Sequence, residues 1–433
     1  MKHVPHCSPH QKISIPALAL RGVGIVSRLV MFGAIVQSLI PAPASAQVLQ
    51  ILSPEEEEAA ILKRDNIQLE KLGEVPKGEV NPAAANGAFA IGVGSQARQN
   101  ASFAIGKEAK AKSPNAAAIG FKSIASGNSA VALGKDAEAA GHISTAIGTG
   151  ANARQTGAVA IGLGSRAGGY KSIALGSGTT ANGKMSTAIG VDARATSIQS
   201  TAIGLSSEAY GIDATAIGVN AQAHADKSFA GGVGAKAHGN LATAIGTGSY
   251  ADGNESIAIG TSAKGMGALS TAVGVNAQAL DAKSIAIGTG AKAYNDLSTA
   301  IGSGSLAKGV KSVAIGTGSF ANGEKAFAIG TGAEANGNAA FAIGDNAVAD
   351  KQLSVALGTG SEATGKLSTA IGVGARASGP INSVAIGTDS AASAELSTSV
   401  GVDSTASGKL STAIGTSSEA YGIDATALSL IHI

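Results

Sequence analysis

The histidines are the side chains of this 433-residue sequence that could most readily do acid–base or metal chemistry. His224 and His238 are 14 residues apart, which is the period of the repeat described below. On stacked strands their rings would lie about 5 Å apart, and such a pair could bind a metal weakly or respond to pH. Because no ladder of acidic residues accompanies them, we interpret the pair as a surface feature and predict no metal site.

Other catalytic arrangements are missing from the sequence. The single cysteine, Cys7, lies in a segment interpreted below as a signal peptide, and Asp and Glu are scattered without a repeated pair. Triplets such as Gly288-Thr289-Gly290 are not followed by a predicted helix, so they do not resemble phosphate-binding loops. The sequence therefore predicts no enzyme activity, no catalytic residue and no cofactor.

Residues 1–46 have the pattern of a secretory signal peptide. A segment with four basic residues and no acid leads into an apolar stretch from Leu29 to Ile40. Small residues then predict cleavage between Ala46 and Gln47. Cleavage would remove four of the 31 Lys and Arg residues, leaving 27 against 29 Asp and Glu. This slightly negative balance argues against nucleic acid as a partner.

Residues 47–87 are predicted to form a lead-in before the repeats. Ser53-Pro54-Glu55-Glu56 resembles a helix start, with a capping Ser, Pro in the first turn and acids near the positive end of the helix dipole. A short helix to about residue 72 and a linker are expected. The helix could nucleate a trimer or simply be solvated.

Residues 88–427 are one repeat with a period of 14. Glycine closes an Ala-Ile-Gly-like triplet at 92, 106, 120 and onward to 372, then at 387, 401 and 415, which makes 24 copies. Counting from this glycine as position 0, position −1 is Ile, Leu or Val in 23 copies, and positions −2 and +5 are Ala in 23. Position +3 is Ser, Ala or Thr, whereas +4 and +6 vary freely. A fixed short period predicts a stacked repeat architecture.

Each unit predicts two short strands, at −4 to −1 and +3 to +6, separated by glycine bends. One unit would close one coil of an all-β solenoid, a parallel β-roll of 14-residue coils stacked about 4.8 Å apart. The low aromatic content of 3% predicts a thin interior. We expect the −1 column to fill it, as in Ile91, Ile105, Ile147, Ile287 and Ile315.

The −2 column is then expected to point out of the coil. An outward position that stays Ala in nearly every copy suggests a second packing surface that admits only methyl groups. Closed symmetry is the usual way to cover such a surface, so we predict a homotrimer. The residues predicted to form its contact face include Ala90, Ala104, Ala146, Ala286 and Ala314.

Aromatic side chains at +4 and +6 are candidates for a ligand-binding face. They include Tyr210, Tyr250, Tyr294 and Phe320. Exposed aromatics are common in binding surfaces, although scattered single apolar residues are also ordinary.

Units such as Lys283-Ser284-Ile285-Ala286-Ile287-Gly288 resemble the head repeats of YadA-like trimeric autotransporter adhesins. The resemblance implies a left-handed, homotrimeric roll displayed on the outer membrane of a Gram-negative bacterium. It implies adhesion to host cells, to other bacteria or to extracellular matrix proteins such as collagen. No stalk or membrane anchor of that family is recognised, so contact with a membrane would be made only through an anchor missing from this chain.

Two expectations remain, one about the C-terminal residues and one about an alternative function. Residues 428–433 break the repeat and read as a translated sequencing adapter, so we expect a non-native tail there. The alternative function is a monomeric ice- or surface-binding β-solenoid without a membrane anchor, because Thr recurs at −3 and +1, as in Thr299 and Thr317.

Overall fold

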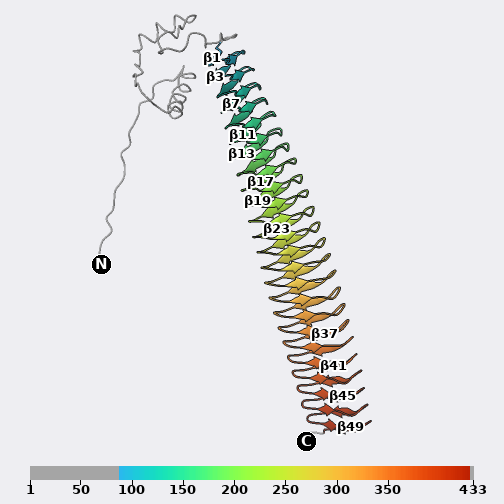
Figure 1. Ribbon diagram of the computed structural model, residues 1–433. Helices are drawn as coiled ribbons and strands as arrows, with labels where there is room; N and C mark the ends of the chain where they lie inside the picture. Colours follow the sequence, from blue (N-terminus) through green and yellow to red (C-terminus); the bar gives the residue numbers. More distant parts are fainter. Residues whose placement is uncertain (1–86, 430–433) are drawn as a thin grey trace, which may run out of the picture. The chain divides into compact units, whose positions relative to one another are not determined.

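A computed structural model describes residues 87–429, which form a single stack of β-coils (Figure 1). The odd-numbered strands have three residues and end just before the repeat glycine, from β1 (Phe89–Ile91) to β49 (Thr426–Leu428). The even-numbered strands have two residues at positions +4 and +5, from β2 (Gln96–Ala97) to β48 (Glu419–Ala420). The predicted all-β solenoid with two strands per 14-residue coil is confirmed.

Two parallel sheets run along the stack. Sheet A contains the odd-numbered strands and sheet B the 24 even-numbered strands. Each strand pairs with its equivalent in the next coil without a register shift, as in Ile91↔Ile105 and Ala97↔Ala111. The extra residue near Pro380 is absorbed in a turn, because β41 (Thr369–Ile371) and β43 (Val384–Ile386) still pair in register.

Several predicted segments lie outside the described residues. They are the signal peptide with Ala46 and Gln47, the helix of the lead-in, and residues 430–433 of the tail. Leu428 is described, and it pairs with Ile414 in the last strand pair of sheet A. Within residues 87–429 no helix is long and apolar enough to cross a membrane.

The interior of each coil holds four small side chains. In the coil around Gly288 these are Ser284, Ala286, Ala291 and Ala293, and none of them is exposed. Throughout residues 87–429 every buried side chain belongs to Ala or Ser, with Thr179 as the one larger exception. The thin interior expected from the composition is confirmed.

The prediction of which face of the first strand lies inside the coil is wrong. The −2 alanines line the interior: Ala104, Ala146, Ala286 and Ala314 are fully buried and Ala90 is 4% exposed. The −1 side chains point outward. Ile91 and Ile287 are each 38% exposed, and Ile105, Ile147 and Ile315 are partly exposed. Two short strands joined by tight turns leave too little space between the sheets for side chains as large as Ile, so the alanine methyl groups lie inside.

Most of the buried serines satisfy their hydroxyl groups within the turns, whereas the Oγ atoms of Ser256, Ser270, Ser312 and Ser411 have no hydrogen-bond partner among the described residues. Ser123 Oγ donates to the carbonyl oxygen of Gly120 at 3.0 Å, and Ser144 Oγ donates to that of Gly141 at 2.7 Å. A side-chain bond of this kind replaces water for a buried polar group. Ser399, the one departure from Ala at −2, is hydrogen-bonded to Ser404 across the interior at 2.6 Å.

The repeat glycine is required for two reasons. Gly288 has a φ of 127°, a conformation that residues with a Cβ rarely adopt. A Cβ placed there would also lie 2.6 Å from the carbonyl oxygen of Gly302 in the next coil. The column of glycines therefore allows the coils to stack closely.

Replacing Ala286 by Ile tests the interior. We expect the free energy of unfolding to fall by about 1–3 kcal/mol, because a filled core must distort to accept added methyl groups. The matched control, Lys292→Ile, places the same side chain on the outer face of the same coil, and a change within about 0.5 kcal/mol is expected. Urea unfolding followed by circular dichroism measures both variants. Equal stability of the two would contradict the assigned interior.

Candidate functional site

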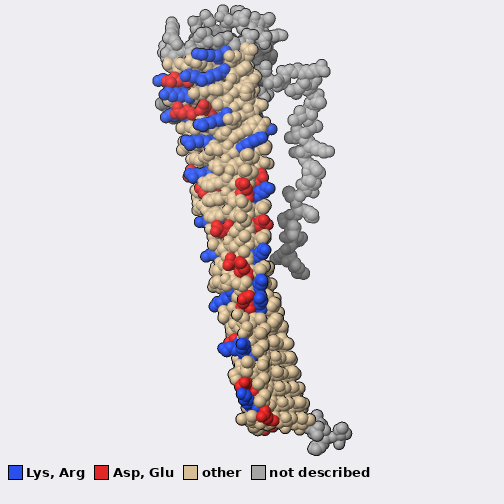
Figure 2. Space-filling model, turned by 90° about the vertical axis from the view of Figure 1, so that its right-hand side faces the viewer, with Lys and Arg blue, Asp and Glu red and all other residues tan. Residues whose placement is uncertain are grey.

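Two outer faces of the rod differ in chemistry. The outer face of sheet B carries the variable side chains at +4 and +6, most of which are charged, polar or aromatic and a few aliphatic, such as Ile124, Leu280 and Leu306. The outer face of sheet A carries the side chains at −3 and −1, which are Ile, Val, Leu, Thr, Phe, Ala or Gly and never charged. In Figure 2 the Lys, Arg, Asp and Glu side chains accordingly gather on part of the visible surface and leave the rest without charge.

An aromatic cluster lies on sheet B, beside β18 (Glu208–Ala209), β20 (Gln222–Ala223), β22 (Lys236–Ala237) and β24 (Tyr250–Ala251). We call Tyr210, His224, His238 and Tyr250 the histidine stack. The rings of His224 and His238 are parallel within 9°, with centroids 4.9 Å apart. Tyr210 stacks on His224 at 4.9 Å, and Tyr250 meets His238 edge-on at 5.2 Å. The predicted stacking of the two imidazoles is confirmed.

Acidic residues flank the stack at both ends, contrary to the expectation of a pair without acids. Glu208 Oε2 lies 3.4 Å from His224 Nε2, and Asp252 Oδ1 lies 3.5 Å from His238 Nδ1. Asp252 lies in the same +6 column as His238, one coil further on, whereas Glu208 reaches diagonally from +4 to +6 of the next coil. A comparison of both columns across adjacent coils would have found these acids.

The local environment favours the neutral forms of His238, Tyr210 and Tyr250. Burial is the main cause that lowers the pKa of His238, and the nearby His224 adds to it, while Asp252 opposes the shift. Burial raises the pKa of Tyr250, as does its hydrogen bond to Asp252, to which the phenol donates at 2.8 Å. Burial and a hydrogen bond to Glu208 likewise raise the pKa of Tyr210.

The chemical groups of the stack are aromatic rings and the two carboxylates beside them. Among the described residues, no group of three His, Cys, Asp or Glu side chains converges as a metal site. Within the same residues, His238 Nε2 is covered and has no hydrogen-bond partner. What the arrangement offers is a continuous aromatic surface bordered by carboxylates, which suits recognition of another molecule.

The predicted ligand-face residues fall in three places. Tyr210 and Tyr250 belong to the histidine stack. Tyr294 follows β30 (Lys292–Ala293) and is 36% exposed. Phe320 begins β34 (Phe320–Ala321), with Lys308 Nζ 5.0 Å from the centre of its ring. The structure therefore brings only two of the four together.

The outer face of sheet A is a second candidate site, which the sequence analysis placed inside. Its aromatic side chains stack between coils, with ring centroids 5.2 Å apart for Phe89 and Phe103 and 5.0 Å apart for Phe327 and Phe341. At Gly231, the one −1 position without a side chain, a Cβ would lie 2.9 Å from the ring of Phe229, which covers the gap. A continuous apolar surface of this kind marks an interaction site.

The lowered pKa of His238 predicts a pH dependence of stability. As the pH falls from about 7.5 to about 5.5, an unfolded imidazole takes up a proton before the folded one does, so the free energy of unfolding should fall. Replacing His238 by Asn should weaken this dependence, whereas His142→Asn, in an exposed turn, should leave it unchanged. Urea unfolding across this pH range measures the effect. An unaltered pH dependence in His238→Asn would refute it.

Comparison with known proteins places the chain in a family. The family model "YadA head domain repeat (2 copies)" matches residues 83–109, 111–137, 139–165, 167–184, 181–207, 209–235, 237–263, 267–291, 293–319, 321–347, 335–361, 349–366, 363–390 and 406–428. These segments cover well over half of the chain. No curated protein matches the sequence.

One solved structure with similarity to the chain is the collagen-binding domain of the Yersinia adhesin YadA. It is 28% identical, and the match covers 38% of this chain and 68% of that one, with a TM-score of 0.21. The family model spans the same coils that form sheets A and B. The chain therefore belongs to the family of proteins built from YadA head repeats, which supports a general role in adhesion.

Proposed function

We propose that the chain is the head of a homotrimeric surface adhesin of a Gram-negative bacterium. It would attach polyvalently to extracellular matrix proteins such as collagen, to host cells or to other bacteria. The predicted signal peptide at residues 1–46 would direct its export. The observation that carries the proposal is the uncharged outer face of sheet A, which extends over all the described coils.

The outer face of sheet A exposes apolar side chains along the whole stack, and association with another chain would bury them. Side chains such as Ile259, Ile287 and Ile343 are 37–39% exposed and lie in register along the stack. About 24 coils at about 4.8 Å each make a rod of roughly 115 Å, so the surface far exceeds what isolated soluble proteins leave exposed. A second and third copy of the chain would cover it along its whole length.

The corrected orientation changes the proposed trimer contact. The face formed by Ala90, Ala104, Ala146, Ala286 and Ala314 is buried within one chain, so it is not available to another. The isoleucines of the −1 column would form the trimer contact instead. A three-fold arrangement would turn the sheet A faces toward one another and leave the sheet B faces outward.

Sheet B would then carry the binding contacts. Its outer side chains differ from coil to coil, and the histidine stack, Tyr294 and Phe320 are the aromatic contacts it offers. Three copies of each coil would multiply weak contacts into avidity.

The ice-binding alternative is supported by one observation. Thr187, Thr201 and Thr215 lie in register and point outward on sheet A. The column is interrupted by Ile173 and Phe229, so a regular lattice of hydroxyl groups is not continued. Thermal hysteresis of the chain would support this alternative.

Sedimentation tests the trimer. We expect residues 47–427 to sediment as a trimer, and Ile287→Asp combined with Ile315→Asp to dissociate it, because charges would enter the apolar contact. The control, Leu306→Asp with Phe320→Asp, changes the outer face of sheet B in the same region and should remain trimeric. A monomeric wild-type protein would refute the trimer.

Binding to immobilised collagen tests the adhesive role. The trimer should bind, and the dissociated variant should lose about 100-fold or more in apparent affinity, because avidity depends on several linked contacts. Absence of binding by the wild-type trimer to collagen would contradict collagen as its ligand. Unchanged binding by the monomeric variant would contradict the polyvalent mechanism.

A further inference from the structure

The charges are unevenly distributed along the rod. Residues 87–199 contain 11 Lys and Arg and 4 Asp and Glu, whereas residues 200–429 contain 12 and 17. Figure 2 shows the same trend, with Lys and Arg predominating toward the N-terminal coils and both signs mixed in the later ones. Although the net charge of the chain is small, the coils of residues 87–199 therefore carry an excess of positive charge.

Within the basic end, residues 139–191 contain no Asp or Glu. They contain four basic residues, Arg154, Arg166, Lys171 and Lys184. Cations in later coils lie next to acids, as Arg376 lies 3.8 Å from Glu362. The nearest acids along the chain are Glu138 and Asp192, which flank this segment, and among the described residues neither forms an ion pair with its four cations.

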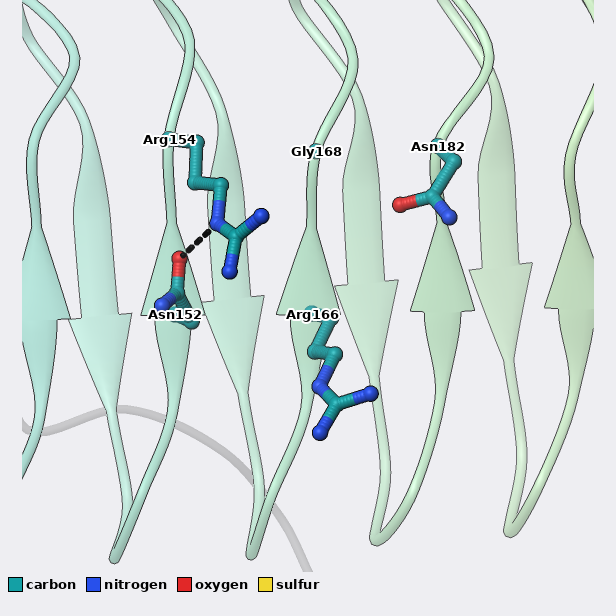
Figure 3. Close-up of a pocket in the computed structure, with 5 residues that line it drawn as sticks. All are labelled: Asn152, Arg154, Arg166, Gly168 and Asn182. Carbon is teal, nitrogen blue, oxygen red and sulfur yellow. Dashed lines mark hydrogen bonds between the residues drawn. The ribbon is translucent and has the colours of Figure 1, made fainter.

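Two of these cations border a hollow on sheet B. It has a volume of about 150 Å³ and is lined by Asn152, Arg154, Arg166, Gly168 and Asn182. The residues come from three adjacent coils, at β10 (Asn152–Ala153), β12 (Arg166–Ala167) and β14 (Thr180–Ala181). Gly168 has no side chain at the +6 position, between Arg154 and Asn182 of the neighbouring coils, and this opens the hollow (Figure 3).

The two arginines at the hollow keep most of their donors available, whereas Asn152 uses one N–H of Nδ2 to donate to Glu138 Oε2 at 2.8 Å. Arg154 Nε donates to Asn152 Oδ1 at 3.1 Å, which orients the guanidinium and leaves its terminal nitrogens unused among the described residues. Arg166 makes no side-chain hydrogen bond or ion pair within residues 87–429. Its planar group can bind an oxyanion with two parallel hydrogen bonds.

The adjoining turns add two further cations around a tyrosine. Lys171 Nζ lies 5.4 Å and Lys184 Nζ 6.0 Å from the centre of the Tyr170 ring. The ring attracts both ammonium groups to this turn, two residues beyond Gly168. Positive charge is therefore repeated over several coils, at a spacing of about 4.8 Å per coil along the rod.

We propose that the sheet B face of residues 139–191 binds a sulfated polysaccharide. A linear polyanion matches cations repeated along the rod, and the Arg groups match sulfate. The carboxamides of Asn152 and Asn182 can hydrogen-bond sugar hydroxyls. Single-stranded nucleic acid fits less well, because such binding uses a series of aromatic platforms and Tyr170 is the only aromatic residue in the segment. The site lies on one chain and goes beyond the proposed trimeric adhesion to matrix proteins.

Binding of the full chain to immobilised heparin tests the proposal. We expect Arg154→Ala with Arg166→Ala to weaken binding about tenfold or more, and to lower the slope of log affinity against log salt concentration by about 2. The matched control, Lys264→Ala with Arg376→Ala, removes two charges at the +4 position of sheet B and should change affinity less than about twofold. An equal loss in both double variants would show nonspecific charge attraction and overturn the site.

A second variant keeps every cation. Gly168→Asp would fill the hollow with a carboxylate between the two arginines and should abolish binding. Neutral dextran should not bind, and double-stranded DNA should bind more weakly than heparin at the same salt concentration. Tighter binding to DNA, or heparin binding by Gly168→Asp at wild-type strength, would overturn the proposal. Sedimentation and collagen binding of the same variants should be unchanged, which separates this site from the proposed trimeric adhesin.

Discussion

The rest of the structure depends on the close approach of sheets A and B across an interior that admits Ala and Ser. With four small side chains per coil, such as Ser284, Ala286, Ala291 and Ala293, the two strands of a coil are almost in contact. Short turns can then close the coil within 14 residues. The repeat glycines meet a second constraint, the close stacking of the coils, because any Cβ at Gly288 would meet the backbone of the next coil.

The narrow interior also decides what the surface must be. Thr179 is the largest side chain buried among the described residues, and no Ile, Val or Leu side chain is buried there, so the −3 and −1 columns carry their apolar groups on the outside of sheet A. A methyl group buries much less apolar surface than an Ile side chain does, and the stack draws its stability from contacts between neighbouring coils. Covering the outer isoleucines would add the larger share of apolar burial. The narrow interior therefore leaves an apolar face exposed on sheet A, and the proposed association with further copies of the chain would bury it.

The sequence was sufficient for the period, the two strands, the bends and the thin core, but not for the side of the first strand. Alternation with a period of two tells which residues share a face and does not tell which face is inside. The uniform Ala at −2 was correctly interpreted as a steric constraint and wrongly placed between chains. The small residues at +3 and +5 held the missing signal. Side chains that face each other across one narrow interior must be small on both strands, which places −2 and −4 opposite them.

The surface sites were predicted less completely, because they join residues from different columns. The pairing of His224 with His238 follows directly from the 14-residue period, as does that of His238 with Asp252 in the same column, whereas Glu208 reaches His224 diagonally. The hollow at Gly168 likewise depends on a missing side chain between Arg154 and Asn182. Sheet B is free of the packing constraint that fixes sheet A, so its outer residues can differ in every coil. The same rod can therefore combine one uniform apolar face with a series of local sites, each defined by three or four neighbouring coils.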